Sequence, residues 1–508
     1  MTATTDGTDT QASAARHGRL ADALAPLLLL ALSVVTIGAR YWEPDSLFWD
    51  ENYHVTSAQK HLDGVMYMES HPPLGKMLIA LGERAVGAND GRDASALLHA
   101  DRVQQAQLPP GYSFAGVRLA STVSAIATVL LLYAALLFAT GQRLLAFVFA
   151  ALPALDNALV VHARSAMLEG IQLAFAAGAI GALAWSLRAG VRVRLRHYAV
   201  LGTLVGLAVA VKLNGAVLLL LPVALFVAEQ WPALREARGL AVARRLAGAV
   251  PAFCLPLLIV FLGSFYAFIA TSTTVVPEHA YKASPEYLQH LRDGTTWTAS
   301  GFRVGLRDHL RYMAEYADGV PRLDVCKPGE NGSHASRWLL GGKTINYRWN
   351  RADAGGVNRV SYTYLVANPV VWLSVLAGLA LSVSLVVARA AFGLAVADPR
   401  AFGWVLLFTS LHLAYLAAIL QIERVMYLYH YLLPLLFGIA NLAAVWNYLY
   451  GAGLAAGQPH PRVNLLLFLL LAAAAFVYFA PLTYGWPLTA SAVEHRAWLD
   501  AWQLEPVR

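Results

Sequence analysis

The sequence predicts an all-α integral membrane protein, a bundle of about eleven membrane-spanning helices with two long non-cytoplasmic loops. Hydrophobic residues make up 58% of the chain and charged residues 14%, and the mean hydropathy is +0.51. A soluble globular chain has about 25% charged residues. Apolar runs long enough to cross a bilayer recur along the chain, and in lipid only helices or closed barrels satisfy the backbone. These runs are uniformly apolar and longer than barrel strands, so we expect helices.

The apolar runs place the expected spans in order along the chain. They cover residues 22–40, 116–138, 143–162, 166–188, 198–212, 214–228, 246–270, 368–390, 402–420, 429–450 and 463–482. The region 198–228 is two spans or one long helix broken at Lys212-Leu213-Asn214-Gly215. The first run is followed by Tyr41-Trp42-Glu43-Pro44 without a small-residue cleavage site, so we interpret it as a retained anchor.

The arginines predict the orientation of the bundle, because cytoplasmic loops carry an excess of Lys and Arg. With a cytoplasmic N-terminus, the short inner loops hold Arg143, Arg188, Arg192, Arg194, Arg196, Arg235, Arg238, Arg244, Arg245, Arg389 and Arg400. Two long loops, 41–115 and 271–367, then lie outside. The net charge of +7 is explained by insertion topology in this way, and we expect no nucleic-acid partner.

This orientation divides the chain into five segments. We expect a disordered cytoplasmic N-terminus at 1–21, a transmembrane module at 22–270 that includes loop 41–115, a second outer loop at 271–367, a C-terminal set of helices at 368–482 and an outer tail at 483–508. The second outer loop has short helical patterns near 285–317. No internal repeat marks a two-fold transporter, and no Gly-rich phosphate loop follows a strand.

Polar clusters that are distant in sequence fall on the outer side under this one threading. They are Asp50-Glu51, the segment that begins at His71, Asp156-Asn157 with His162-Ala163-Arg164, Lys212 with Asn214, and the segment from Glu423 to Tyr431. Helix ends that meet on one membrane face can build a shared site.

Asp50 and Glu51 follow directly on the first span. A carboxylate near a low-dielectric boundary has a raised pKa, which suits a general base. Neighbouring side chains in an extended segment point in different directions, so one carboxylate can face a substrate while a partner holds the other. The alternative is a solvated pair in a loop.

The segment His71-Pro72-Pro73-Leu74-Gly75-Lys76 predicts a helix start, because the prolines fix φ and the second can open a helix. Residues 74–85 are amphipathic and suited to the membrane interface. His71 and Lys76 would then face a headgroup or a phosphate. The alternative is a structural helix start with a snorkelling lysine.

Arg118, Arg164 and Arg424 lie at outer helix ends. Arginine binds phosphate oxygens in a two-pronged geometry and stays charged, which indicates an anionic ligand in the membrane plane. Anchoring by snorkelling is the competing account. Tyr429 and His430, with the tyrosines beside them, fit the same site or an interfacial aromatic belt.

No metal site is predicted. Asp50, Glu51, His54 and His71 are residue types that bind cations, but their spacing matches no specific ligand pattern. A divalent cation is therefore left as an open alternative.

Together and in this order, the motifs resemble the protein O-mannosyltransferase family, polyprenyl-phosphate-dependent glycosyltransferases of the GT-C membrane fold. The matching segments are Trp49-Asp50-Glu51, His71 to Lys76, Gly116 to Leu119, Leu155-Asp156-Asn157, Arg164 to Glu169, Val211 to Gly215 and Tyr427 to Pro434. The resemblance runs from about residue 20 to 440, and its most specific part is the His-Pro-Pro-Leu-Gly-Lys element with the upstream Asp-Glu pair.

The resemblance implies an enzyme that moves mannose from a polyprenyl phosphate to a hydroxyl acceptor, with inversion. Asp50 would be the base, and Glu51 would support it or contact the acceptor. Arg118, Arg164, Lys212 and Arg424 would bind the donor phosphate. His71, Lys76, Asp156, Asn157, Tyr429 and His430 would shape the pocket. The expected setting is the plasma (inner) membrane, with the site on the periplasmic or extracellular face and membrane lipid around it.

One departure from the family leaves the acceptor open. Eukaryotic members carry a large β-trefoil insertion in the second outer loop, and residues 271–367 are too few to hold one, so a bacterial-type member is expected. Serine or threonine of a protein is the family's usual acceptor, and a lipid or a glycan is the alternative. Two further alternatives are transfer of another sugar, such as an amino-pentose, to a lipid, and a lipid or sugar transporter.

Overall fold

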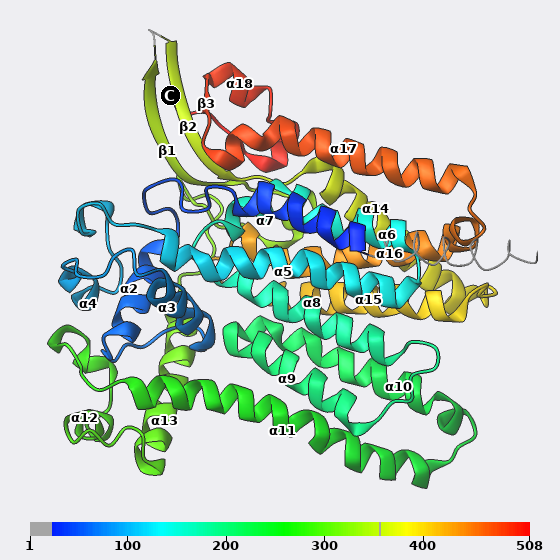
Figure 1. Cartoon of the computed structure of the whole chain (residues 1–508), viewed down its shortest axis with the longest axis horizontal. Helices are drawn as coiled ribbons and strands as arrows, with labels where there is room; N and C mark the ends of the chain where they lie inside the picture. The colour runs from blue at the N-terminus through cyan, green and yellow to red at the C-terminus, as the bar shows by residue number, and fades with distance from the viewer. Residues whose placement is uncertain (1–22, 355–356, 508) are drawn as a thin grey trace, which may run out of the picture.

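The computed structural model describes residues 23–354 and 357–507, and its long helices lie roughly side by side (Figure 1). In this part of the chain, eight helices are long and apolar enough to cross a membrane. They are α5 (Ala115–Thr140), α8 (Leu168–Ser186), η4 with α10 (Leu213–Leu219 and Leu220–Arg235), α11 (Gly239–Thr271), α14 (Pro369–Phe392), α15 (Pro399–Ile419), η7 with α16 (Leu428–Tyr431 and Leu432–Ala455) and α17 (Pro459–Tyr484).

Three further apolar segments, two shorter helices and one bent pair, lie where the remaining spans were expected. They are Ala23–Gly38, which ends in the π-turn η1 (Val34–Gly38), α9 (Leu195–Val211), and a bent pair made of α6 and η3 (Arg143–Ala151 and Leu152–Leu155) followed by α7 (Asn157–Ala163). The bend is 61°. The helical membrane fold is therefore confirmed, while the expected N-terminus 1–21 lies outside the described residues.

Two polar positions explain the breaks in these helices. Asp156 is extended, and its carboxylate accepts a hydrogen bond from the Leu159 N–H, so it ends η3 and caps α7. Lys212 is also extended, with φ −155° and ψ 130°, and separates α9 from η4. The region 198–228 is thus two helices.

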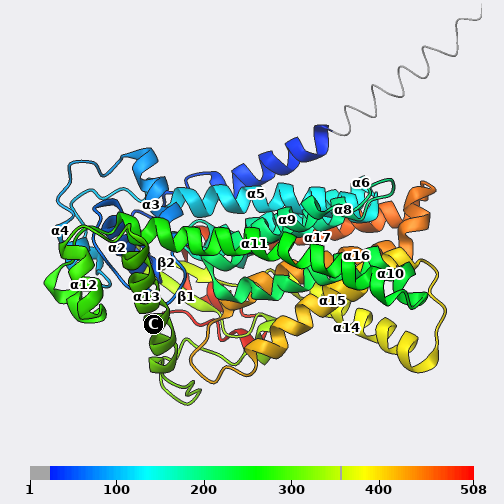
Figure 2. The same ribbon diagram turned by 90° about the horizontal axis from the view of Figure 1, so that it is seen from below.

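The shorter elements gather at one end of the bundle in both views (Figures 1 and 2). Residues 51–107 supply α2 (Glu51–Leu62), α3 (Leu74–Val86), α4 (Ser95–His99) and η2 (Gln105–Gln107). Residues 277–340 supply η5 (Pro277–Lys282), α12 (Pro285–Arg292), α13 (Ala299–Gly319) and η6 (Ala335–Leu340). We call this end of the bundle the capped end.

A three-stranded antiparallel sheet, which sequence patterning did not predict, also lies at the capped end. Its order is β1 (Ile345–Ala354), β2 (Val357–Leu365) and β3 (Pro487–Leu488). The short elements α18 (Ala490–Glu494) and η8 (Asp500–Trp502) follow β3. The Thr344 N–H donates to the carbonyl of Trp502 at 2.8 Å, and Trp502 is fully buried. The last residues therefore fold back onto the base of the hairpin.

Close backbone contact holds α3 against the first turn of α5. A Cβ on Gly82 would lie 2.6 Å from the carbonyl oxygen of Gly116, and a Cβ on Gly116 would lie 2.6 Å from Cα of Glu83. No side chain fits between the two helices here. This contact fixes α3, and the His71 segment before it, beside the end of α5.

Candidate active site

Asp50 is held in place by the strained residue before it. Trp49 has a left-handed backbone, with φ 51°, a conformation that costs free energy and persists only when its surroundings hold it. Its ring stacks on Tyr347 at 5.3 Å and meets the edge of Tyr427 at 5.3 Å. Asp50 follows as the N-cap residue of α2, so the direction of its side chain is set by this aromatic packing.

The Asp50 carboxylate is partly buried and has one defined partner. The Tyr429 hydroxyl donates to Oδ2 of Asp50 at 3.1 Å. Burial raises the pKa of Asp50 above its ordinary value, and the Tyr429 hydrogen bond opposes this shift. A carboxylate with a raised pKa accepts a proton more readily than an ordinary aspartate, which suits a general base.

Next to Asp50 lies a network of four charged or polar groups. Glu169, in the first turn of α8, forms an ion pair with Lys212. The Nε2 of His162 lies 2.8 Å from Oε2 of Glu169, and the Nδ1 lies 2.8 Å from the Tyr347 hydroxyl. The charges of Glu169, Lys212 and His162 all act on the pKa of Asp50, so the network and the carboxylate share one site.

Three members of the network, Glu169, His162 and Tyr347, were not among the predicted site residues. Glu169 and His162 are ionisable groups within apolar runs, and that placement is by itself a signal of function. Tyr347 gave no such signal, because its position depends on the hairpin that was not predicted.

A cavity of about 750 Å³ opens at this network. Its polar end is lined by His71, Lys212, Asn214, Arg424 and His430, and its remaining walls are mostly apolar side chains of η4, α13 and α15. The structure therefore brings together six of the predicted site residues, namely Asp50, His71, Lys212, Arg424, Tyr429 and His430.

The polar end of the cavity is suited to an anion. Lys212 has one carboxylate partner, Glu169, for its three N–H donors. Among the described residues, the Arg424 side chain forms no hydrogen bond or ion pair, and neither does the His71 ring. Burial and then the charge of Lys212 lower the pKa of His71 well below its ordinary value, so this ring is neutral. Two cations with free donors thus face the cavity.

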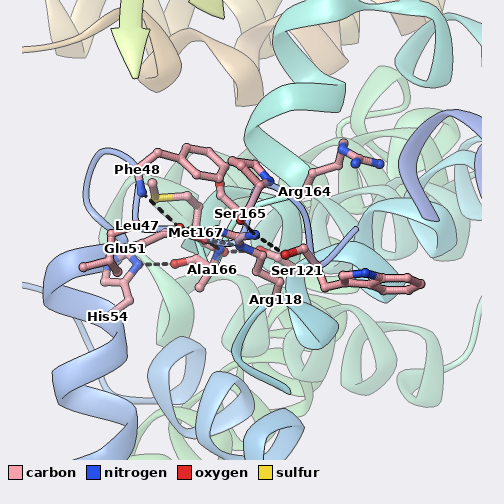
Figure 3. Close-up of polar contacts among 12 residues, drawn as sticks. Leu47, Phe48, Glu51, His54, Arg118, Ser121, Arg164, Ser165, Ala166 and Met167 are labelled. Carbon is pink, nitrogen blue, oxygen red and sulfur yellow. Dashed lines mark hydrogen bonds and ion pairs between the residues drawn. The ribbon is translucent and has the colours of Figure 1, made fainter. Parts of the chain in front are cut away.

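Arg118 has a different role from the one expected. It is fully buried and forms a two-pronged ion pair with Glu51, at 2.7 Å from Nε to Oε1 and 2.8 Å from Nη2 to Oε2 (Figure 3). Its other N–H groups donate to the carbonyls of Trp42, Pro44 and Ser46. All five donors are used, so the prediction that Arg118 binds a phosphate is wrong for this geometry.

Glu51 is likewise fully occupied. In addition to the Arg118 pair, it accepts the Ala166 N–H at 2.8 Å and the Phe48 N–H at 3.2 Å (Figure 3). A carboxylate without exposed surface cannot contact an acceptor. Glu51 instead joins the loop before α2 to Arg118 of α5 and to Ala166, just before α8.

Arg164 also supports the chain before Asp50. Its guanidinium donates to the carbonyls of Ile37, Ala39 and Arg40, at 3.1, 2.7 and 2.9 Å, and lies over the Tyr484 ring at 5.0 Å. These carbonyls belong to the end of the first helix, where backbone acceptors lack partners. Arg164 was expected to contact a phosphate. Its guanidinium instead caps the end of the first helix.

Three residues expected in the pocket are buried away from it. Lys76 is 2% exposed and forms an ion pair with Glu69, so it faces neither a headgroup nor the interface. The Asp156 carboxylate accepts from the Trp372 indole at 2.8 Å as well as capping α7. The Asn157 amide donates to Thr483 at 2.8 Å and to a carbonyl of α17. The Asp156 and Asn157 contacts connect helices, and none of the three residues lines the cavity.

The open alternative of a cation site on Asp50, Glu51, His54 and His71 does not assemble. Glu51 is paired with Arg118, and Nδ1 of His54 lies 2.5 Å from the carbonyl of Ala166 (Figure 3). Within residues 23–354 and 357–507, no three His, Cys, Asp or Glu side chains are grouped so as to hold a metal ion.

Two family models match most of the chain. The model described as "Dolichyl-phosphate-mannose-protein mannosyltransferase" matches residues 27–276, and the model described as "C-terminal four TMM region of protein-O-mannosyltransferase" matches residues 322–502. Together they include Asp50 and the polar residues that line the cavity, while the α13 side chains in the cavity wall lie between the two matched ranges.

Two curated relatives and one solved structure are also similar to this chain. Protein O-mannosyl-transferase 2 of Drosophila melanogaster is 36% identical over 66 residues, and that of Drosophila pseudoobscura pseudoobscura is 33% identical over 66 residues. Each match covers 12% of this chain and only 9% of the relative's length. The S. cerevisiae Pmt1-Pmt2 protein O-mannosyltransferase complex bound to the sugar donor has a TM-score of 0.77 at 14% identity, over 95% of this chain and 92% of that chain. This likeness shows a shared fold.

Proposed function

The chain belongs to the protein O-mannosyltransferase family, and from this premise we propose that it transfers mannose from a polyprenyl phosphate to a serine or threonine hydroxyl of a polypeptide. The observation that carries the proposal is the position of Asp50 beside a cavity whose polar end presents Lys212 and Arg424. We propose further that the enzyme is a bacterial-type member in the plasma membrane, with the capped end on the periplasmic or extracellular face.

The proposed reaction is a single displacement at the anomeric carbon of mannose. The acceptor oxygen forms a bond to this carbon while the bond from carbon to phosphate oxygen breaks, and the hydroxyl proton passes to the Asp50 carboxylate. The phosphate gains charge as it leaves, and cations aimed at that charge lower the barrier. Attack opposite the leaving group inverts the anomeric centre.

Each residue of the site has a defined part in this reaction. Lys212 is oriented by Glu169, which His162 holds in turn, so the ammonium is fixed before donor binds. Arg424 has no partner among the described residues and can bind phosphate oxygens with two N–H groups. The apolar walls of the cavity accept the first part of the lipid chain.

The direct test of this proposal is a transfer assay on the purified full-length protein. Polyprenyl phosphate mannose with a serine- and threonine-rich peptide should give a mannosylated peptide. Replacement of the peptide by a lipid acceptor, or of the mannose donor by an amino-pentose donor, should give no product. Transfer to the lipid alone would instead favour the lipid-directed alternative, and absence of transfer with every pair would contradict the proposal.

Removal of either free cation should weaken donor use. Lys212→Gln and Arg424→Gln are each expected to lower kcat/KM for polyprenyl phosphate mannose about 10- to 100-fold, because a hydrogen bond to a charged group contributes about 1.5–3 kcal/mol. Arg292→Gln, on the exposed surface of α12, is the matched control and should leave kcat/KM within about twofold. Equal losses in all three variants would contradict the assignment.

The pH dependence of transfer should report the Asp50 environment. The base acts when deprotonated, so kcat/KM should fall as pH drops through the pKa of Asp50, at a pH above the ordinary aspartate value of about 3.9. Tyr429→Phe removes the hydrogen bond that lowers this pKa, so the acidic limb should move to higher pH. Tyr427→Phe keeps that bond and serves as the control. An acidic limb that does not move in Tyr429→Phe would exclude Asp50 as the titrating group.

A further inference from the structure

A second, mostly apolar cavity lies beside the first, along α10 and α15. The cavity at Lys212 and Arg424, called here the near cavity, includes Leu220 in its wall, and so does a cavity of about 660 Å³, called here the far cavity. The far cavity is lined by α10 from Leu220 to Trp231 and by α15 from Pro399 to Ser410. The two cavities share Leu220 in their linings, and each has α15 in its wall, so we treat them as two parts of one groove that runs along η4, α10 and α15.

The length of this groove matches the thickness of a membrane. At about 2.0 Å per residue in a 3₁₀ helix and 1.5 Å in an α-helix, the chain from Leu213 to Trp231 rises about 30 Å. The hydrocarbon core of a bilayer is also about 30 Å thick. The antiparallel helix α15, from Pro399 to Ile419, has about the same length. The far cavity alone occupies about 16 Å of this distance, about the depth of one leaflet.

The position of the far cavity, one leaflet away from Lys212 and Arg424, distinguishes short lipid chains from long ones. A lipid whose phosphate is bound at Lys212 and Arg424 places its chain along the apolar wall toward Leu220. A chain that spans only one leaflet ends near Leu220, where the far cavity begins. Only a chain longer than one leaflet reaches Trp231 and Pro399 at the other end of the groove.

We infer that the far cavity binds the distal part of a long polyprenyl chain, so that the enzyme selects its donor by chain length. This inference rests on the proposed function, since the chain is that of the mannose donor. Burial of added methylene groups in the far cavity contributes binding free energy that a short donor cannot obtain.

Gly403 offers a way to fill the far cavity without disturbing the near one. It lies on α15 in the wall of the far cavity, and a Cβ built there meets no atom within 4 Å. Gly403→Leu therefore adds a side chain to open space. Ala228→Leu does the same from the opposite wall, on α10. Gly263→Leu, on α11, also meets no atom within 4 Å and is the matched control outside the groove.

The test compares undecaprenyl phosphate mannose with citronellyl phosphate mannose as donors to the same peptide, using the full-length protein. The unmodified protein should prefer the long donor. Gly403→Leu and Ala228→Leu should lower kcat/KM for the long donor about tenfold, the loss expected when a few methylene groups lose burial, and leave the short donor within about twofold. Gly263→Leu should change neither.

Three outcomes would overturn the inference. They are equal use of both donors by the unmodified protein, equal losses for both donors in the groove variants, and no loss for the long donor in those variants. The last result would assign the far cavity to ordinary membrane lipid. None of these outcomes coincides with failure of the proposed function, in which the unmodified protein transfers mannose from neither donor.

Discussion

Asp50→Asn should lower kcat for mannosyl transfer about 10²- to 10⁴-fold, the range expected when a general base is removed. An amide has the same shape as the carboxylate and can still accept a hydrogen bond from Tyr429, but it cannot take the proton of the acceptor hydroxyl. Donor affinity and thermal stability should therefore change little. The measurement is kcat and KM for the donor, together with the unfolding temperature.

The control for this substitution is Asp63→Asn. Asp63 is exposed at the other end of α2, so it tests the same chemical change on the same helix. It should leave kcat within about twofold. A normal kcat in the Asp50→Asn variant would remove Asp50 from the mechanism, whereas a lower unfolding temperature together with the loss of activity would give it a structural role.

Arg118→Met should destabilise the protein by about 3–5 kcal/mol, the typical effect of removing one partner of a buried ion pair. Glu51 would lose its ion-pair partner at a fully buried position, and the carbonyls of Trp42, Pro44 and Ser46 would lose their donor. The expected result is a large drop in unfolding temperature and in yield. Arg84→Met, at an exposed position of α3, should change neither.

A second variant separates this structural role from phosphate binding. Adding Glu51→Gln to Arg118→Met removes the unpaired charge and should recover part of the lost stability, because the remaining cost is confined to neutral groups. If Arg118 bound the donor phosphate, Arg118→Met would raise KM at unchanged stability and Glu51→Gln would rescue nothing. That pattern would contradict the assignment made from the structure.

The fold could be predicted because membrane insertion requires long apolar runs. Each expected span corresponds to a helix, and the break at Lys212 was visible as a polar interruption. The hairpin of β1 and β2 could not be predicted in this way. Apolar and polar residues alternate only over the short runs 345–350 and 360–364, and the pairing of β2 with β3 depends on residues more than a hundred positions away in sequence.

The site was predicted only in part, because residue type does not determine burial. Arg118 and Arg424 were both expected at outer helix ends. Arg118 lies in the first turn of α5 and is surrounded by five acceptors, whereas Arg424 lies in the loop between α15 and η7 and faces a cavity. The rotation of α3, which buries Lys76 against Glu69, is set by tertiary contacts with α5. The capping role of Asp156 could have been predicted, since an aspartate just before a helix is a preferred N-cap residue.

The most direct test of this account is an experimental structure of the full-length protein with polyprenyl phosphate mannose bound. The account predicts phosphate oxygens within hydrogen-bond distance of Lys212 and Arg424, with the anomeric carbon of mannose facing the Asp50 carboxylate. Arg118 should keep its pairing with Glu51. A phosphate bound at Arg118 or Arg164, or a mannose directed away from Asp50, would contradict it.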